Sequence, residues 1–285
     1  MAKDKVAIVC DSVCNLPPEL VAQNDIHVVP AIVNWEGASL LDGVDISTQA
    51  FYDRLRVSKE LPKTSQPSPG QFAEKFEELK DRYAGIVVIT VSELLSGTFA
   101  SAVLGRESLP ADYPIEIVDS RSASLGQGLM GLAAARMAAD GKGTAEIAGY
   151  VRSLVPGMRV LFAVDTLEYL HKGGRIGGAQ RLVGSMLSIK PVLHLHEGRV
   201  EPLASIRTKS KAIQHMFDVV IGEAQGKGRI HLGVIHAQAP DAAADLTERA
   251  TAALSPVEVV VAELSPTIGT NVGPGTVGMG YYIEP

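Results

Sequence analysis

Short apolar strands alternate with helical segments through the first half of this chain, and this order most limits the possible fold. A fully apolar run at 6–9 and further strand signals at 86–90 and 115–118 are each followed by a segment with helical spacing. A wholly apolar run is typical of a strand buried on both faces of a parallel sheet. The alternation therefore predicts an N-terminal parallel-sheet α/β domain over residues 1–156, with helices on both faces of the sheet.

Capping signals indicate where several helices begin and end. Ser68-Pro69-Gly70-Gln71 is a capping box with proline at the first helical position. Asn15 is expected to cap a helix that opens just after it, and Asp165 or Thr166 a short helix in the second half. Gly173-Gly174 is expected to end that short helix.

The second half of the chain has a different pattern. Ile189–His196 and Arg199–Arg207 flank a Glu197-Gly198 turn and predict a β-hairpin. Further strands and helices alternate after it, at 230–236, 241–254 and 258–264. We expect a C-terminal domain over residues 157–285, with helices on a mixed or antiparallel sheet, and a ligand site between the two domains.

Four loops rich in hydroxyl groups or glycine stand out. They are Thr64–Gly70, Ser96-Gly97-Thr98, Asp119-Ser120 with Ser122 and Ser124, and the Gly/Pro loop Gly269–Gly275. Hydroxyls, backbone N–H groups and helix N-termini can bind an anion without Lys or Arg. The loops therefore predict a site for a buried acidic head group.

The first three loops should meet if the α/β interpretation is right. Ligands of open α/β sheets bind at the edge where the strands end. We expect Asp11-Ser12, Thr64-Ser65, Ser96-Gly97 and Asp119-Ser120 to converge there. Taken singly, each of these residues is more simply explained as a helix cap or turn residue.

Composition excludes several classes of function. The 285 residues carry a net charge of -6, which argues against nucleic-acid binding. No apolar stretch approaches the roughly 20 residues that cross a bilayer, and the start Met1–Lys5 does not resemble a signal peptide. Neither Cys10 with Cys14 nor His194 with His196 completes a metal site. We expect a cytoplasmic protein without a transmembrane segment, metal or cofactor.

Common nucleotide and hydrolase motifs are absent or incomplete. Gly273-x-Gly275-x-x-Gly278 matches the dinucleotide fingerprint literally, but Pro274 lies inside it and too few residues follow for a βαβ unit. The chain has no P-loop and no G-x-S-x-G nucleophile elbow. An acyl-transferring or hydrolytic enzyme using Ser96 stays open, provided that a base lies within hydrogen-bond reach.

Motifs along nearly the whole chain, residues 5–283, resemble those of the DegV family. They are Cys10-Asp11-Ser12, Asp42–Ile46, Thr64–Ser68, Leu95–Thr98, Val118-Asp119-Ser120, Asp165–Leu170, Lys172–Ile176, Ile189-Lys190-Pro191 and Val272–Gly275. The family includes the fatty-acid-binding subunits of bacterial fatty acid kinases. The resemblance implies a lipid-binding protein rather than an enzyme, with a long-chain fatty acid such as palmitate in a buried tunnel between two domains.

The resemblance also implies roles for individual residues. Thr64 and Ser96 are expected to hold the carboxylate, in a site shared with Ser65, Gly97, Thr98 and Asn271. A separate ATP-binding kinase subunit would phosphorylate the bound acyl group. Arg175 and Arg207 are candidates for binding that partner, although both can equally be solvated surface charges.

One residue departs from the family pattern. Relatives usually have His immediately before Val-Gly-Pro-Gly, where this chain has Asn271. An amide donates two hydrogen bonds but carries no charge. The change is more compatible with lipid binding than with partnership with a kinase. Besides an enzyme using Ser96, a sensor or scaffold that is merely stabilised by bound lipid is the second alternative function.

Overall fold

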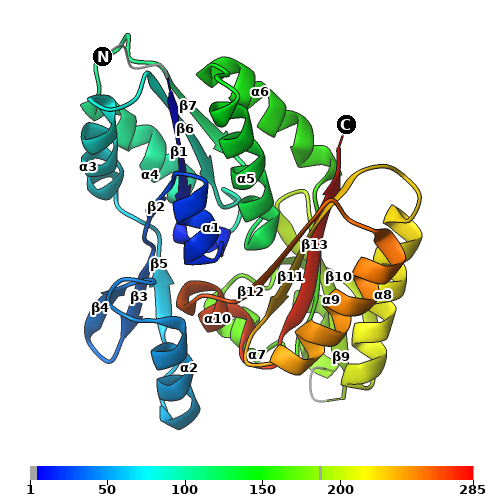
Figure 1. The fold of residues 1–285 in the computed structure, drawn as a ribbon. Helices are drawn as coiled ribbons and strands as arrows, with labels where there is room; N and C mark the ends of the chain where they lie inside the picture. Colours follow the sequence, from blue (N-terminus) through cyan, green and yellow to red (C-terminus); the bar gives the residue numbers. More distant parts are fainter. Residues whose placement is uncertain (1–4, 186–187, 285) are drawn as a thin grey trace.

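The computed structural model describes residues 5–185 and 188–284, which form two α/β units side by side (Figure 1). Segment 1–4, for which the sequence predicts no signal peptide, lies outside the described residues. Among the described residues, no helix is long and apolar enough to cross a bilayer. The two units confirm the predicted α/β class with two different sheets.

A parallel sheet forms the centre of the N-terminal unit, as its apolar runs predict. Its strand order is β2-β1-β6-β7, with β1 Val6–Asp11, β2 Ile26–Val29, β6 Gly85–Thr90 and β7 Ile115–Asp119. Helices α3 (Pro69–Lys80) and α4 (Thr98–Gly105) cover one face, and α5 (Leu125–Ala139) and α6 (Thr144–Leu154) cover the other. Along β1, Ala7 and Val9 pack toward α3, whereas Ile8 and Cys10 pack toward α5.

The capping predictions are confirmed in part. Ser68 and Gln71 form both hydrogen bonds of the capping box at α3, and Gly174, with φ 74°, ends α7 (Glu168–Gly173). The N-cap residue of α7 is Leu167 and not Asp165 or Thr166, although Thr166 Oγ1 accepts a hydrogen bond from Glu168 N (3.1 Å). The prediction for Asn15 is wrong, because no side chain caps α1 (Pro18–Gln23).

Asn15 instead joins the two halves of the chain. Its side-chain amide donates to Glu263 O (2.6 Å) and accepts from Ser265 N (2.9 Å). Its backbone is left-handed, with φ 57°, at the end of the short 3-10 helix η1 (Ser12–Cys14). The side chain therefore serves the long-range contact and not the helix that follows it.

A mixed sheet forms the centre of the C-terminal unit. Its order is β10-β9-β8-β13-β11-β12, with β8 Arg159–Ala163, β9 Lys190–His196, β10 Arg199–Ile206, β11 Ile230–His236, β12 Glu258–Glu263 and β13 Val277–Ile283. Only β11 and β12 pair in parallel, and the predicted hairpin is β9 with β10. Helices α8 (Lys209–Ala224) and α9 (Pro240–Leu254) pack on one face. The 3-10 segment η4 (Gly177–Ser185) lies against β10.

The C-terminal segment differs from the prediction. A loop was expected over 269–275, but Gly269–Val272 belongs to helix α10 (Pro266–Val272). Ser265 and Pro266 start this helix, and the turn at Gly273 (φ 76°) ends it. The strand β13 that follows lies inside the sheet between β8 and β11, and it is absent from the prediction.

A small antiparallel sheet is the other element missing from the prediction. Its order is β4-β3-β5, with β3 Ile32–Trp35, β4 Ala38–Leu41 and β5 Lys63–Ser65. It projects with α2 (Thr48–Val57) below the parallel sheet (Figure 1). α10 packs against both β5 and α2, so this extension reaches the C-terminal unit.

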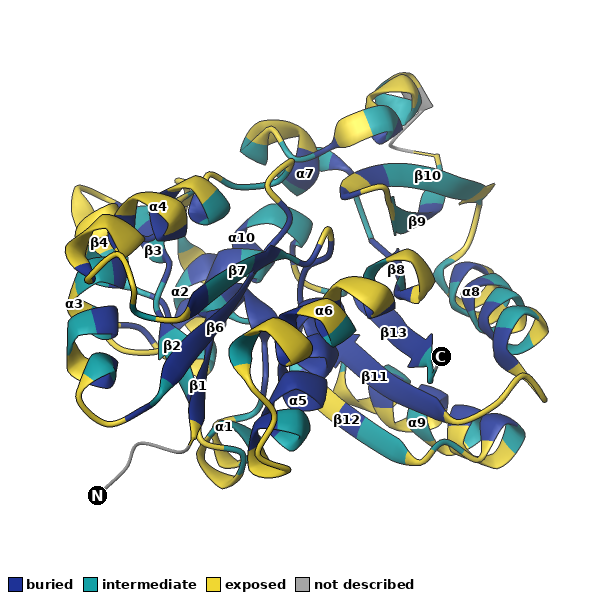
Figure 2. Cartoon of the chain, turned by 90° about the horizontal axis from the view of Figure 1, so that it is seen from above, coloured by how far each residue is buried: buried dark blue, intermediate teal, exposed yellow. Residues whose placement is uncertain are grey.

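Helix α5 lies between the two large sheets and is buried along nearly its whole length (Figure 2). Small residues permit this close approach. A Cβ on Gly126 would lie 2.5 Å from Val160 Cγ2, and one on Gly233 would lie 2.8 Å from Leu125 Cβ. The first turn of α5 therefore packs directly on the centre of the mixed sheet.

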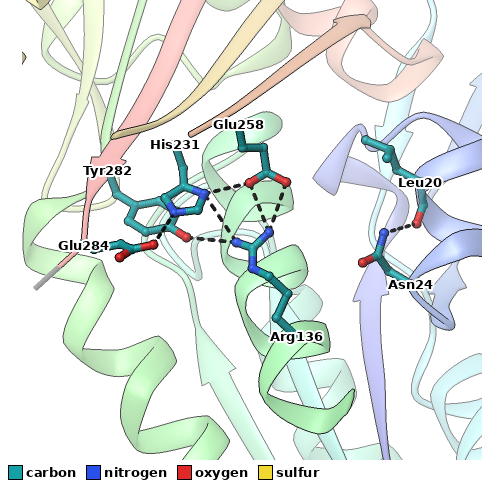
Figure 3. A network of polar contacts seen from close by, with 7 residues as sticks. All are labelled: Leu20, Asn24, Arg136, His231, Glu258, Tyr282 and Glu284. Atoms are coloured by element: carbon teal, nitrogen blue, oxygen red, sulfur yellow. Dashed lines mark hydrogen bonds and ion pairs between the residues drawn. The ribbon is translucent and has the colours of Figure 1, made fainter. Parts of the chain in front are cut away.

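A polar network near the other end of α5 also joins the two units (Figure 3). Arg136 Nη1 lies 3.0 Å from Glu258 Oε1 on β12, and Arg136 Nη2 donates to Tyr282 Oη on β13 (3.1 Å). His231, which is 5% exposed, lies between Glu258 Oε2 (2.8 Å) and Glu284 Oε1 (2.9 Å). These contacts hold α5 against three strands of the mixed sheet.

Candidate functional site

A cavity lies between the two units. It holds about 860 Å³ of empty space, counting the part open to solvent. Its apolar lining comes from both units: Val13, Ala31, Val91, Leu95, Ala123, Val160, Phe162, Leu170, Leu195, Val200, Ile235, Leu264, Ile268 and Val272.

Polar side chains from three separate elements meet at the same cavity. Thr64 comes from β5, Ser96 from the loop after β6, and Asn271 from α10; all three line the cavity and are half-buried. Asn271 Nδ2 lies 3.5 Å from Thr64 Oγ1. Thr64 and Asn271 are more than two hundred positions apart in the sequence. The fold therefore brings the predicted residues Thr64, Ser96 and Asn271 to one cavity.

The loop that carries Ser96 is held by its own backbone. Leu95 N and Ser96 N both donate to Ser92 O, at 3.0 Å and 3.1 Å. Gly97 is the N-cap residue of α4, and a Cβ there would lie 2.9 Å from Gln66 Nε2. Gly97 thus allows the Thr64–Ser68 loop to pack against the Ser96 loop, although it is not itself among the lining residues.

The hydroxyl of Ser96 pairs with a second hydroxyl. Ser96 Oγ and Thr98 Oγ1 are 2.8 Å apart, and Thr98 is 1% exposed. Among the described residues, Ser96 Oγ therefore forms its hydrogen bond with a hydroxyl and not with a side chain that could act as a base. The pair has one hydrogen left to donate toward the cavity.

Asn271 has a fixed orientation with one unused oxygen. Its Nδ2 donates to Thr267 O (2.9 Å), one turn earlier in α10. Its Oδ1 is buried without a hydrogen-bond partner among the described residues. Gly173, at the end of α7, leaves room for this amide, because a Cβ at that position would lie 2.4 Å from Oδ1.

Arg175 is the one charged side chain among the described residues that line the cavity. Its Nε donates to Leu95 O (3.1 Å) and its Nη1 to Gly173 O (2.7 Å). The guanidinium therefore connects the end of α7 to the Ser96 loop across the two units. Arg207 lies elsewhere: it is exposed, follows β10, and is not among the lining residues.

Ser65 and the strand-end aspartates have local roles. Ser65 lines the cavity but is exposed, and its Oγ accepts from Asn34 Nδ2 (2.9 Å). Asp11 accepts from Val13 N, Val91 N and Gln127 Nε2, and burial raises its pKa to about 6 despite these donors. Asp11, Ser12, Asp119 and Ser120 are all absent from the lining residues. Of the four pairs expected to converge, Thr64-Ser65 and Ser96 therefore reach the cavity and the two Asp-Ser pairs do not.

Four further polar residues line the cavity without having been assigned to the site from the sequence: Gln66, Ser124, Thr267 and Thr276. Gln66 stands next to Thr64-Ser65, and Ser124 ends the third hydroxyl-rich loop. For these two, the sequence signal is membership of those loops. No group of three or more His, Cys, Asp or Glu side chains within residues 5–185 and 188–284 is arranged to hold a metal ion.

Comparison with known proteins gives one consistent family. The family model for an uncharacterised protein of the DegV family matches residues 5–284. A DegV domain-containing protein of Streptomyces coelicolor is 36% identical over 276 residues, covering 96% of this chain and 97% of the relative. Protein DegV of Bacillus subtilis is 32% identical over 275 residues, covering 96% of this chain and 98% of the relative.

Solved structures show the same similarity. A DegV family protein of Thermus thermophilus, described by its fatty acid binding, superposes with a TM-score of 0.91 at 35% identity and covers 98% of this chain and 99% of its own. Bacillus subtilis DegV, described as a fatty acid binding protein, gives 0.90 at 30% identity, covering 99% and 100%. A stearic acid-binding protein of Eubacterium ventriosum gives 0.89 at 25% identity, covering 98% of each chain.

Proposed function

Because this chain belongs to the DegV family, we propose that it binds one long-chain fatty acid in the cavity between its two units. The observation that carries the proposal is the cavity itself: its lining is largely apolar, and hydroxyl and amide groups also line it. The relatives described as fatty-acid-binding proteins support the same ligand.

Burial of the acyl chain would supply the affinity. A saturated chain of about fifteen methylenes, at roughly 0.8 kcal/mol each, contributes some 12 kcal/mol of gross transfer free energy. Part of this is offset by ordering the chain on binding. A ligand such as palmitate therefore has ample driving force to enter a cavity lined largely by apolar side chains.

The carboxylate needs donors because burying it without hydrogen bonds costs several kcal/mol. Thr64, the Ser96–Thr98 hydroxyl pair and the Asn271 amide are the neutral donors that we assign to it, with Ser65 and the Gly97 backbone beside them. Arg175 lines the cavity too, but two of its donor groups are already bonded to carbonyl oxygens. On this proposal the head group is held mainly by neutral hydrogen bonds.

A kinase partner would act on the fatty acid once it is bound. The family resemblance favours a cytoplasmic, ATP-binding kinase partner that phosphorylates the bound acyl group, with this chain as the lipid-binding subunit and not itself an enzyme. Neutral donors suit such a role, because they leave the carboxylate oxygen nucleophilic. Arg175 and the exposed Arg207 are the candidates for contact with the partner.

Mass spectrometry of ligands extracted from the denatured native protein tests fatty acid binding. We expect one saturated or unsaturated long-chain fatty acid per chain at near-stoichiometric amount. Recovery of polar metabolites alone, or of no ligand after expression in a lipid-replete host, would contradict it. Incubation of the loaded protein with a fatty acid kinase partner and ATP tests the kinase partnership, with acyl phosphate as the expected product.

A further inference from the structure

The start of helix α5 forms part of the cavity wall, on a different element from those that carry Thr64, Ser96 and Asn271. Ser124 is the N-cap residue of this 15-residue helix and lines the cavity. The neighbouring lining residues Val160 and Ile235 come from the mixed sheet, on which the first turn of α5 packs. Both of these neighbours are apolar, as expected for the part of a cavity that holds a hydrocarbon tail.

Ser124 does not do what an N-cap serine ordinarily does. Such a serine accepts a hydrogen bond from the second or third N–H of its helix, with an extended backbone. Here φ is 54° and ψ is -143°, and no side chain caps α5. The hydroxyl therefore makes no cap hydrogen bond to the helix that it precedes.

The hydroxyl is also buried without a partner. Ser124 is 4% exposed, and its Oγ makes no hydrogen bond to any described residue. Buried hydroxyls nearly always have a partner. A hydroxyl without a partner and an uncapped helix N-terminus thus occur at one place on the cavity wall. An oxygen atom would suit both, because it accepts a hydrogen bond from the hydroxyl and is attracted by the partial positive charge of the helix N-terminus.

We propose that this place is a second polar subsite, which binds an oxygen substituent, a hydroxyl or keto group, carried by the acyl chain beyond its carboxylate. Ser124 Oγ would donate to that oxygen, and the partial positive charge of the α5 N-terminus would favour it. The inference rests on the proposed function and narrows its ligand class from plain to oxygenated fatty acids.

Ser122 provides a matched control within the same loop. Its Oγ is likewise buried without a recorded partner and it is 2% exposed, but it is not among the residues that line the cavity. Ser122→Ala therefore removes a similar hydroxyl from a similar environment outside the subsite. Ser124→Gly complements Ser124→Ala, because glycine adopts a positive φ without strain and so keeps the loop folded.

The experiment compares palmitate with its ω-hydroxy and mid-chain hydroxy derivatives by isothermal titration of delipidated protein. For the wild type, we expect at least one hydroxylated chain to bind more tightly than the parent chain. That preference should fall by roughly tenfold in Ser124→Ala and Ser124→Gly, the size of one hydrogen bond, and should persist in Ser122→Ala. Thr64→Val should weaken all the acids by the same factor and leave the preference intact.

The outcomes separate this inference from the proposed function. The subsite is refuted if palmitate binds but no hydroxylated chain is preferred, or if the preference survives in both Ser124 variants. Ser124 then binds no oxygen of the acyl chain. If none of the acids binds the wild type, the proposed function itself fails. A preference lost equally in Ser122→Ala would assign the effect to the loop and not to Ser124.

Discussion

Replacing Thr64 with valine tests the proposed carboxylate site with little disturbance of the fold. Thr64 lies on β5 opposite Val33 of β3, and valine has the same shape and suits a strand. Its hydroxyl has one long contact, 3.5 Å from Asn271 Nδ2, so the unliganded protein loses little. The free energy of unfolding without ligand should change by less than about 0.5 kcal/mol.

The effect on ligand binding should be much larger. A hydrogen bond to a charged group contributes about 1.5–3 kcal/mol. The dissociation constant for palmitate should therefore rise by roughly tenfold to a hundredfold, at 1.4 kcal/mol for each factor of ten. Thr64→Ser keeps the hydroxyl and should recover most of the affinity.

Displacement of a fluorescent fatty acid, with isothermal titration of palmitate as a second measurement, gives the two constants. Ser39→Ala is the control, because Ser39 is an exposed hydroxyl on β4 of the same small sheet and bonds to Asn34, outside the cavity lining. Binding by Thr64→Val within twofold of the wild type would show that Thr64 does not contact the carboxylate. Equal losses in Thr64→Val and Ser39→Ala would mean that the small sheet as a whole was disturbed.

Three further predictions concern two residues that line the cavity, Asn271 and Arg175, and the contact of Arg136 between the units. Palmitate affinity should change little between about pH 6.5 and 8, since Arg175 is the one charged described side chain that lines the cavity, and titrations of Asn271→His should gain a pH dependence in that window. Arg175→Ala should weaken lipid binding several-fold, because it removes the hydrogen bond to Leu95 O. It should also weaken any kinase-dependent phosphorylation. If a filter assay shows loss of phosphorylation while lipid binding is unchanged, Arg175 serves only to bind the partner. Arg136→Ala should lower the free energy of unfolding by about 1–2 kcal/mol in urea titrations. Although burial favours neutral Glu258, the contacts from His231 and Arg136 hold its pKa below the ordinary value, so this stabilisation should be present near neutral pH and be lost as the pH falls through the acidic range.

Local signals predicted much of the architecture correctly. The apolar run of β1, and the alternation of β1, β6 and β7 with helices, predicted a parallel sheet. A strand buried on both faces, such as β1, needs no polar alternation. The Ser68 capping box and the Gly174 turn set helix ends by bonds within a few residues. Such features depend on neighbouring residues only, and so they can be recognised in the sequence.

The elements that were missed depend on distant partners. β13 contains Gly278 and Gly280 and has a weak strand signal, yet it lies inside the mixed sheet because glycine permits close packing there. A Cβ on Gly278 would lie 2.8 Å from Leu161 O of β8. Helix α10 is likewise short and contains Gly269, and it is stabilised by packing against α2, β5 and α7.

The sequence by itself determined which kinds of residue this protein has for a site: hydroxyls at strand ends, an aliphatic interior, and an amide at position 271. Only the tertiary structure decided which of them meet. Thr64 reaches the cavity on a small sheet that no local pattern predicts, and Asp11 bonds to backbone N–H groups instead of facing the cavity. Ser124 lines the cavity with a positive φ, and its hydroxyl does not cap the helix that follows. The identity of a residue does not reveal such a backbone conformation, because the surrounding structure has to hold it.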